Sequence, residues 1–193
     1  LTLPLSFYKQ VLDLQDKYFG VSNNRVGNTI QTNGVGIDRK FANFCRDRKV
    51  NIGVSHEGPY NDVLRQKSQI SDANLAYLSK KDHVFSVNST ISAETVGRQT
   101  EIYRHFRDRG INLTLSKVMP VGCSADGSFV PDADEYIRNS IAVFDEWLFD
   151  RNTDVPLIPH YLYIYSALGD PSPSDCAHTS CLTKWICMYP NGD

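Results

Sequence analysis

The stretch VFSVNSTISAETVGRQTEIYRHFRDRGINLTLSKVMP, residues 84–120, decides the fold class of this chain. Its first part, Val84 to Ile91, is rich in β-favouring residues and predicts a strand. The segment from Ala93 to Arg109 predicts a helix, and Ile111 to Pro120 predicts a second strand. A strand, a helix and a strand in this order form a right-handed crossover, which makes the two strands parallel.

The same alternation of strand and helix recurs along the rest of the chain. An amphipathic helix, with Ser6 as its N-cap and Gly20 at its end, precedes the first predicted strand. Asp38 is placed to open the helix that follows this strand. The predicted strands cover residues 28–32, 50–55, 84–91 and 111–120, and the predicted helices cover about residues 6–20, 38–45, 72–79, 93–109 and 132–149.

This pattern predicts an α/β fold with a parallel sheet. Ligands of such folds bind at the carboxyl ends of the strands. The loops at those ends hold much of the Asn, Ser, Asp and Gly of the chain, so we expect the functional site there. The four loops read QTNGVG, SHEGPYNDVLR, NSTISAE and MPVGCSADG.

The composition is that of a soluble globular protein, with 193 residues, of which 41% are hydrophobic and 22% charged. A net charge of -2 offers no surface for nucleic acid or for anionic lipid, so neither is an expected partner. No apolar run approaches the roughly 20 residues of a membrane span. The opening LTLPLSFYKQ lacks the basic start of a signal peptide, which predicts a cytoplasmic location.

Three of the five cysteines, Cys176, Cys181 and Cys187, form a C-x4-C-x5-C pattern. An odd number of cysteines argues against a secreted disulfide scaffold. Thiolates at such spacing beside a predicted hairpin can converge on a metal, and soft sulfur selects an iron–sulfur cluster or zinc. Buried thiols without any metal remain an equal alternative. Cys45, inside a predicted helix, is expected in the core.

Several motifs occur in an order that resembles radical S-adenosylmethionine enzymes with a SPASM extension, among them the anaerobic sulfatase-maturating enzymes and peptide maturases. These motifs are IQTNGVGID, VNIGVSHEGPYNDVLRQ, VFSVNSTISAETV and the final C-x4-C-x5-CMYPNGD. The resemblance extends from about Ser6 to Asp193. It implies a partial (β/α) radical-SAM barrel over residues 1–150, a linker over 151–175 and the start of a SPASM-like cluster-binding module over 176–193.

The sequence also departs from the family pattern. It has neither the C-x3-C-x2-C loop that holds the catalytic [4Fe–4S] cluster nor the Gly-Gly-Glu-Pro-like segment that binds the cofactor amino group. The expectation is therefore that the chain is an internal piece of a longer enzyme. If it were the whole product, it would be a truncated, non-catalytic remnant or a binding module with at most a cysteine-bound metal. A zinc-dependent α/β enzyme is a third reading.

The resemblance assigns cofactor proximity to residues at the strand ends. Ser55 matches a serine near the methionyl group, and Glu57 stands where the family has Asp. Asp62 and Arg65 match a later Asp and Arg, although a surface ion pair at i, i+3 would explain them nearly as well. Asn88, polar within an apolar strand, would face cofactor or substrate, or would be satisfied internally. Thr32 and Asn33 are expected to form a tight turn first and to lie near the cofactor second.

The function implied by the resemblance is the modification of a peptide or protein side chain. A cluster electron would cleave S-adenosylmethionine, and the resulting 5′-deoxyadenosyl radical would abstract a hydrogen atom from the substrate. Flavodoxin or ferredoxin would be the reductant. Auxiliary [4Fe–4S] clusters at Cys176, Cys181 and Cys187 could pass an electron or hold substrate.

Overall fold

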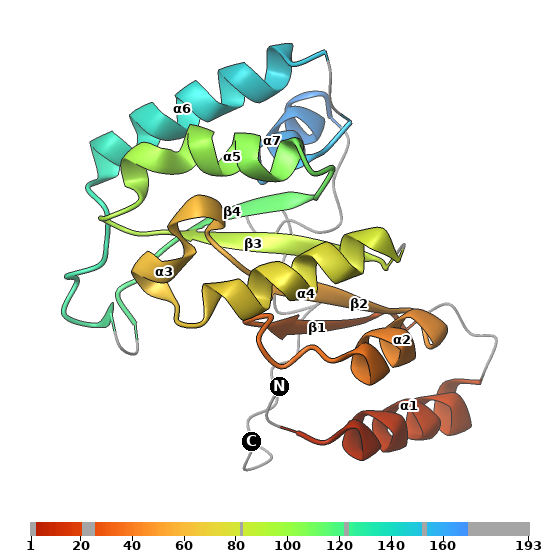
Figure 1. Cartoon of the computed structure of the whole chain (residues 1–193). Coiled ribbons are helices and arrows are strands. Elements are labelled where there is room, and N and C mark those ends of the chain that lie inside the picture. The colour runs from red at the N-terminus through yellow and green to blue at the C-terminus, as the bar shows by residue number, and fades with distance from the viewer. Residues whose placement is uncertain (1–2, 21–25, 82, 122–123, 152–153, 170–193) are drawn as a thin grey trace. The chain divides into compact units, whose positions relative to one another are not determined.

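The computed structural model describes residues 3–20, 26–81, 83–121, 124–151 and 154–169. Contacts divide the chain into two units, Leu1–Leu157 and Ile158–Asp193. The first unit is an α/β structure whose helices and strands alternate along the chain (Figure 1). Its elements are α1 (Leu5–Phe19), β1 (Asn28–Thr32), α2 (Arg39–Asp47), β2 (Val50–Ser55), η1 (Gly58–Tyr60), α3 (Asn61–Leu64), α4 (Ser68–Lys80), β3 (Phe85–Ile91), η2 (Val96–Arg98), α5 (Gln99–Arg107), β4 (Leu113–Lys117) and α6 (Ala133–Phe149).

The strands form one sheet in the same order as in the sequence. β1 pairs with β2, β2 with β3 and β3 with β4, and all three pairs are parallel. A two-residue strand, β5 (Leu157–Ile158), follows β4 in the sheet order at the boundary of the two units. A sequential order keeps every crossover on the same side, as in part of a (β/α) barrel, whereas doubly wound sheets reverse their order.

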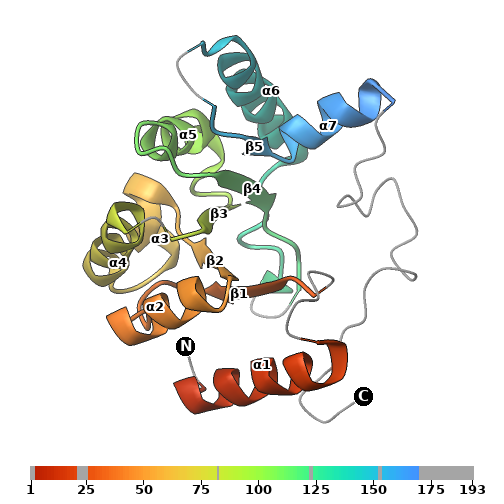
Figure 2. The same ribbon diagram turned by 90° about the vertical axis from the view of Figure 1, so that its right-hand side faces the viewer.

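Helices α2, α3, α4 and α5 lie on one side of the sheet (Figure 2). That side is apolar, and register neighbours such as Val54 and Val87 face it together. The largest fully buried side chains of α5, Tyr103, Phe106 and Ile102, pack in the same core. Cys45 of α2 is also in this core with no exposed surface, as predicted. The predicted α/β class and partial barrel are thus confirmed.

Helix starts follow local chemistry. Asp38 caps α2, because its Oδ1 accepts a hydrogen bond from the Phe41 amide at 2.7 Å. The prediction that Ser6 caps the first helix is wrong. The N-cap of α1 is Pro4, whose carbonyl accepts from the Phe7 amide at 3.0 Å. A proline with extended backbone can open a helix without a capping side chain, since its carbonyl alone starts the ladder.

The connection between β2 and α4 contains more structure than the sequence predicts. It holds η1 and α3, and α4 begins at Ser68 rather than near Asp72. Asn61 fixes this connection from a buried position, donating from Nδ2 to Ser68 Oγ at 2.9 Å and accepting at Oδ1 from the Glu57 amide at 3.1 Å. β4 is shorter than predicted, and α5 begins at Gln99 after η2 instead of at Ala93.

The described part of the second unit contains one helix, α7 (His160–Ala167), within the range predicted as a linker. Tyr161 and Tyr165 form an edge-to-face pair on it, with ring centroids 5.0 Å apart. Among the residues that the structure describes, none of the helices has the length and apolarity that a membrane crossing requires.

Candidate cofactor-binding site

The side of the sheet opposite the helices is polar. Alternate residues of a strand point to opposite faces, so the neighbours of the buried apolar residues share this second face. Parallel sheets are usually apolar on both faces, because helices cover both. A polar face on a parallel sheet therefore indicates contact with water or a polar ligand. Its residues are Thr29, Gln31, Asn51, Gly53, Ser55, Ser86, Asn88, Thr90, Thr114 and Ser116.

Gln31 and Ser55 lie together on this face. Gln31 Nε2 donates to Ser55 Oγ at 2.9 Å. Gly53 permits this arrangement, because a Cβ at that position would lie 2.1 Å from Gln31 Oε1. The Ser55 hydroxyl is thus held by a side chain of the neighbouring strand and keeps its own proton for a further acceptor.

Asn88 is the register partner of Ser55 on β3. Its Oδ1 atom is buried, and within the described part of the chain it has no hydrogen-bond donor. An unsatisfied buried carbonyl is costly, on the order of 1–3 kcal/mol. The alternative expectation, that Asn88 forms an internal hydrogen bond, is therefore not met at Oδ1. Asn88 has an open acceptor beside Ser55, at the carboxyl-terminal half of the sheet.

Glu57 and Arg65 form a bidentate ion pair just beyond β2. Arg65 Nε and Nη2 donate to the two oxygens of Glu57 at 2.7 and 2.9 Å. The Glu57 side chain is fully buried, whereas 26% of the Arg65 side chain is exposed. Glu57 Oε1 also accepts from the Thr90 amide at 3.2 Å, so one carboxylate ties the ends of β2 and β3 to the loop before α4.

The suggested ion pair between Asp62 and Arg65 is not formed. Arg65 is occupied by Glu57, and Asp62 instead accepts a short hydrogen bond from Ser68 Oγ. The reason is local geometry: α3 ends at Leu64, and Arg65 is already extended, with φ -134° and ψ 153°. A spacing of three residues places two side chains on one face only within a continuous helix.

Thr32 and Asn33 form the turn that the sequence predicts. Thr32 Oγ1 accepts from the Gly34 amide at 3.3 Å, and Asn33 Oδ1 accepts from the Val35 amide at 3.1 Å. Gly34 has φ +79°, a value that favours glycine. Asn74 of α4 donates to the Gly34 carbonyl at 2.8 Å. Thr32 and Asn33 thus both have structural hydrogen-bond partners. They lie at the carboxyl-terminal end of β1, on the same end of the sheet as Ser55.

A buried histidine, His56, supports the connection between β2 and α4 from the helix side of the sheet. His56 has no exposed surface, and its Nδ1 accepts from the Gly58 amide at 3.0 Å. Its Nε2 lies 3.0 Å from Asp72 Oδ1. Burial lowers the pKa of His56, and nearby Asp72 opposes this shift only in part. A neutral ring with an acceptor Nδ1 is the form that this contact with Gly58 requires.

His105 of α5 packs beside these groups, with its ring centroid 4.9 Å from that of Phe106. Burial and the neighbouring Arg109 lower its pKa to about 4 from the ordinary 6.5. A folded-state pKa below the unfolded one means that the unfolded chain binds more protons as the pH falls. The contribution of neutral His105 to the stability of the folded protein is therefore fully present above pH 6.5. It is lost as the pH falls towards about 4.

We expect the free energy of unfolding to fall between pH 7.5 and pH 5, and to fall less steeply in a His105→Gln variant, because glutamine does not titrate. Urea denaturation at a series of pH values measures both slopes. Most carboxylates titrate below this interval, so the difference between the two proteins isolates the imidazole. Equal slopes for wild type and variant would contradict the prediction.

Sequence reasoning missed three members of this site. Gln31, Gly53 and Thr90 take part in the contacts described above but were not singled out. The signal that could have found them is the period of two: Ser86, Asn88 and Thr90 alternate with apolar or small residues in VFSVNSTIS. Reading that alternation as a polar face would have predicted the set rather than Asn88 alone.

The predicted metal ligands Cys176, Cys181 and Cys187 lie outside the described residues. Within the described ranges, no three or more His, Cys, Asp or Glu side chains gather in a group that could hold a metal ion. The polar strand ends, in contrast, offer hydrogen-bond partners for a polar organic ligand.

The geometry defines an α/β protein with part of a (β/α) barrel and a polar site at its strand ends. No protein-family profile matches the chain. Three curated relatives are anaerobic sulfatase-maturating enzymes. The cysteine-type enzyme of Clostridium perfringens strain 13 is 30% identical over 115 residues, covering 54% of this chain and 30% of the relative. The serine-type enzyme of Bacteroides thetaiotaomicron is 41% identical over 68 residues, covering 34% of this chain and 16% of the relative. The serine-type enzyme of Klebsiella aerogenes is 23% identical over 201 residues, covering 97% of this chain and 48% of the relative.

Solved structures have the same fold. The structure titled "Native anSMEcpe with bound AdoMet" superposes with a TM-score of 0.77 at 20% identity, covering 89% of this chain and 50% of that chain. The structure titled "Native anSMEcpe with bound AdoMet and Kp18Cys peptide" gives a TM-score of 0.66 at 19% identity, covering 86% and 45%. The resemblance to the anaerobic sulfatase-maturating enzymes is thus confirmed, and the chain spans about half or less of the length of these relatives.

Proposed function

We propose that this chain forms the cofactor-binding part of a radical S-adenosylmethionine enzyme that modifies a peptide or protein side chain by hydrogen abstraction. The proposal rests on the polar sheet face, on the sequence similarity to sulfatase maturases and on the shared fold. S-adenosylmethionine carries amino, carboxylate and hydroxyl groups, and a site of hydroxyl, amide and guanidinium side chains is complementary to them.

The single observation that carries the proposal is the open acceptor of Asn88. Its buried Oδ1 lacks a donor among the described residues, and its register partner Ser55 has a hydroxyl positioned by Gln31. A cofactor hydroxyl or ammonium would supply the missing donor. Binding would then recover the free energy that the unsatisfied carbonyl costs in the free protein, about 1–3 kcal/mol.

Glu57 and Arg65 would act together in this site. The buried carboxylate holds the guanidinium by two hydrogen bonds, which fixes its orientation. Arg65 Nη2 also lies 3.4 Å from Thr90 Oγ1, on the polar face. With 26% of its side chain exposed, Arg65 would bind the carboxylate of the cofactor through its remaining donors. Thr32 and Asn33 would limit the space at the neighbouring strand end.

When bound and reduced by an iron–sulfur cluster, S-adenosylmethionine supplies the radical for hydrogen abstraction. This chain would bind and orient that cofactor and exclude water from it. The cysteines that hold the catalytic cluster would come from outside the 193 residues, and Cys176, Cys181 and Cys187 would bind an auxiliary cluster. The substrate would be a peptide or protein side chain, in line with the peptide named for one similar structure. A flavodoxin or ferredoxin would be the electron donor.

We expect Asn88→Leu to weaken the binding of S-adenosylmethionine by about tenfold in the full-length, cluster-loaded gene product, because a hydrogen bond of about 1.4 kcal/mol is lost. Isothermal titration under anaerobic conditions measures the dissociation constants. Asn51→Leu is the matched control, since Asn51 is an exposed residue of the same sheet face at the opposite end of β2.

The control is expected to bind with unchanged affinity and the same circular dichroism spectrum. Equal affinities for wild type and Asn88→Leu would remove Asn88 from the site. A loss of affinity in both variants would show that the polar face matters only through the stability of the sheet.

A further inference from the structure

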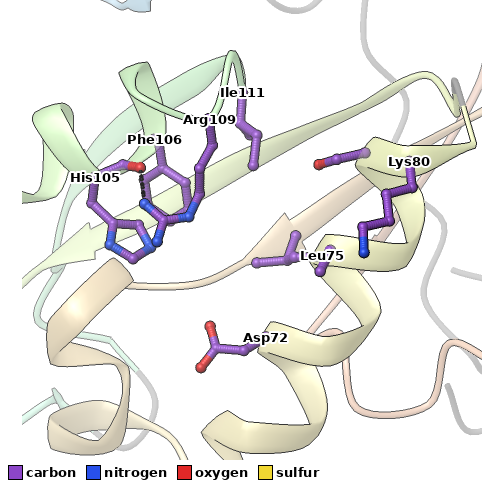
Figure 3. A pocket seen from close by; sticks show the side chains of 9 residues that line it. Asp72, Leu75, Lys80, His105, Phe106, Arg109 and Ile111 are labelled. Carbon is purple, nitrogen blue, oxygen red and sulfur yellow. Dashed lines mark hydrogen bonds between the residues drawn. The ribbon is translucent and has the colours of Figure 1, made fainter.

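A groove of about 480 Å³ lies between α4 and α5, on the helix side of the sheet and away from the polar face (Figure 3). Leu75, Phe106 and Ile111 form its apolar floor, and all three are buried. Ala76 and Ser79 of α4 add small side chains to its wall. This volume is in the range of sites for small organic molecules, and small wall residues leave it open.

Two cations face the groove from opposite walls. Figure 3 shows Lys80 at the end of α4 and Arg109 just beyond α5, with Leu75 between them. Neither cation pairs with a carboxylate among the residues that the structure describes, since Arg109 donates only to the His105 carbonyl, at 2.6 Å. By contrast, Arg104 of α5 forms an ion pair with Glu146. Two unpaired cations beside an apolar floor create a local preference for an anion.

The groove also contains one carboxylate, that of Asp72. Asp72 lies eight residues before Lys80 in α4, a rise of about 12 Å along the helix axis. Its carboxylate is 55% exposed and has buried His56 as its near neighbour. The His105 ring lines the wall, and its lowered pKa keeps it neutral at neutral pH. Lys80, Arg109 and Asp72 together leave one net positive charge in the groove, which balances a single negative charge on a ligand.

We propose that this groove binds a small organic monoanion, a carboxylate that carries an apolar body. The carboxylate is attracted by the positive charges of Lys80 and Arg109 on the two walls, and the apolar part covers Leu75, Phe106 and Ile111. Acidic polymers are excluded, because Asp72 repels further negative charge. The inference is independent of the proposed radical chemistry, since none of its residues belongs to the polar face.

The test compares two probes on the full-length gene product, 4-phenylbutyrate and its neutral amide. Isothermal titration or ligand-observed NMR measures their dissociation constants at low salt. The carboxylate is expected to bind about tenfold more tightly than the amide, because a charge-assisted contact is worth about 1.4 kcal/mol in a partly desolvated site. Added salt is expected to weaken the carboxylate more than the amide.

Lys80→Gln with Arg109→Gln is expected to abolish this difference between the probes. The matched control, Lys81→Gln with Arg138→Gln, removes the same two charges from exposed positions that do not line the groove. This control is expected to leave the ratio of the dissociation constants of the two probes unchanged. Ala76→Trp keeps both cations but fills the space, and is expected to weaken both probes together.

Three outcomes would overturn the proposal. The first is equal affinity for the carboxylate and the amide. The second is an equal loss of the preference for the carboxylate in the groove and control double variants, which would show that only the net charge of the protein matters. The third is the absence of binding to the wild-type chain at probe concentrations up to about 10 mM, corresponding to less than about 3 kcal/mol of binding free energy.

Discussion

Replacing Arg65 by methionine is expected to lower the free energy of unfolding by about 3 kcal/mol, because it leaves the Glu57 carboxylate buried without its partner. Glu57 is fully buried and accepts both hydrogen bonds of the guanidinium. The Thr90 amide would remain as one donor, which is too little to stabilise a charge away from water. Urea denaturation followed by circular dichroism measures the change.

Arg104→Met is the matched control for this prediction. Arg104 also forms a bidentate pair, with Glu146 at 2.6 Å for both bonds, but 54% of its side chain is exposed. The loss of this pair is expected to lower the free energy of unfolding by less than about 1 kcal/mol, as for other surface ion pairs. Combining Glu57→Gln with Arg65→Met should restore about 1 kcal/mol relative to Arg65→Met alone, since the buried charge is then removed. Similar losses for Arg65→Met and Arg104→Met would contradict the account of the buried pair.

Gly34→Ala is expected to destabilise the fold by about 3 kcal/mol, from positive φ together with steric overlap. The backbone of Gly34 has φ +79°, and a Cβ would lie 3.0 Å from Val54 Cγ1 and 3.1 Å from Ser71 Cβ. Both neighbours belong to packed elements, β2 and α4, so neither can move freely. The shift in the urea midpoint of unfolding measures the effect.

Gly110→Ala isolates the backbone part of this loss. Gly110 has φ +64°, but no atom lies within 4 Å of a Cβ added there. We expect a cost of about 1 kcal/mol, from the left-handed conformation alone. If both variants lose the same stability, then contact with Val54 and Ser71 does not restrict position 34, and the tight packing of the turn at the end of β1 is refuted.

The first two strands could be predicted well because each carries its own signal, whereas β4 is shorter than predicted and β5 was not predicted. Asn28–Thr32 and Val50–Ser55 are found within the predicted bounds, since turn residues follow both. Asp38 marks the start of α2 for the same local reason. The short helices η1 and α3 were missed because Asn61 stabilises them through contacts with Ser68 and Ser71, which no local pattern reveals.

The candidate site was predicted less completely. Ser55 and Asn88 were identified from motif and polarity, and the sheet register places them opposite each other. The pair of Glu57 with Arg65 spans eight residues across the connection that holds η1 and α3, a separation at which helical or strand spacing carries no information. Gln31 reaches Ser55 only because Gly53 leaves room, and a contact of this kind depends on three-dimensional packing.

The most direct test of the proposed function is the reductive cleavage of S-adenosylmethionine by the full-length gene product, purified anaerobically with its iron and sulfide content determined. We expect a protein that contains iron–sulfur clusters and cleaves the cofactor when reduced, with cleavage at sub-saturating cofactor lowered in Asn88→Leu but not in Asn51→Leu. A protein that binds iron yet leaves S-adenosylmethionine intact, or one that binds no iron at all, would contradict the account.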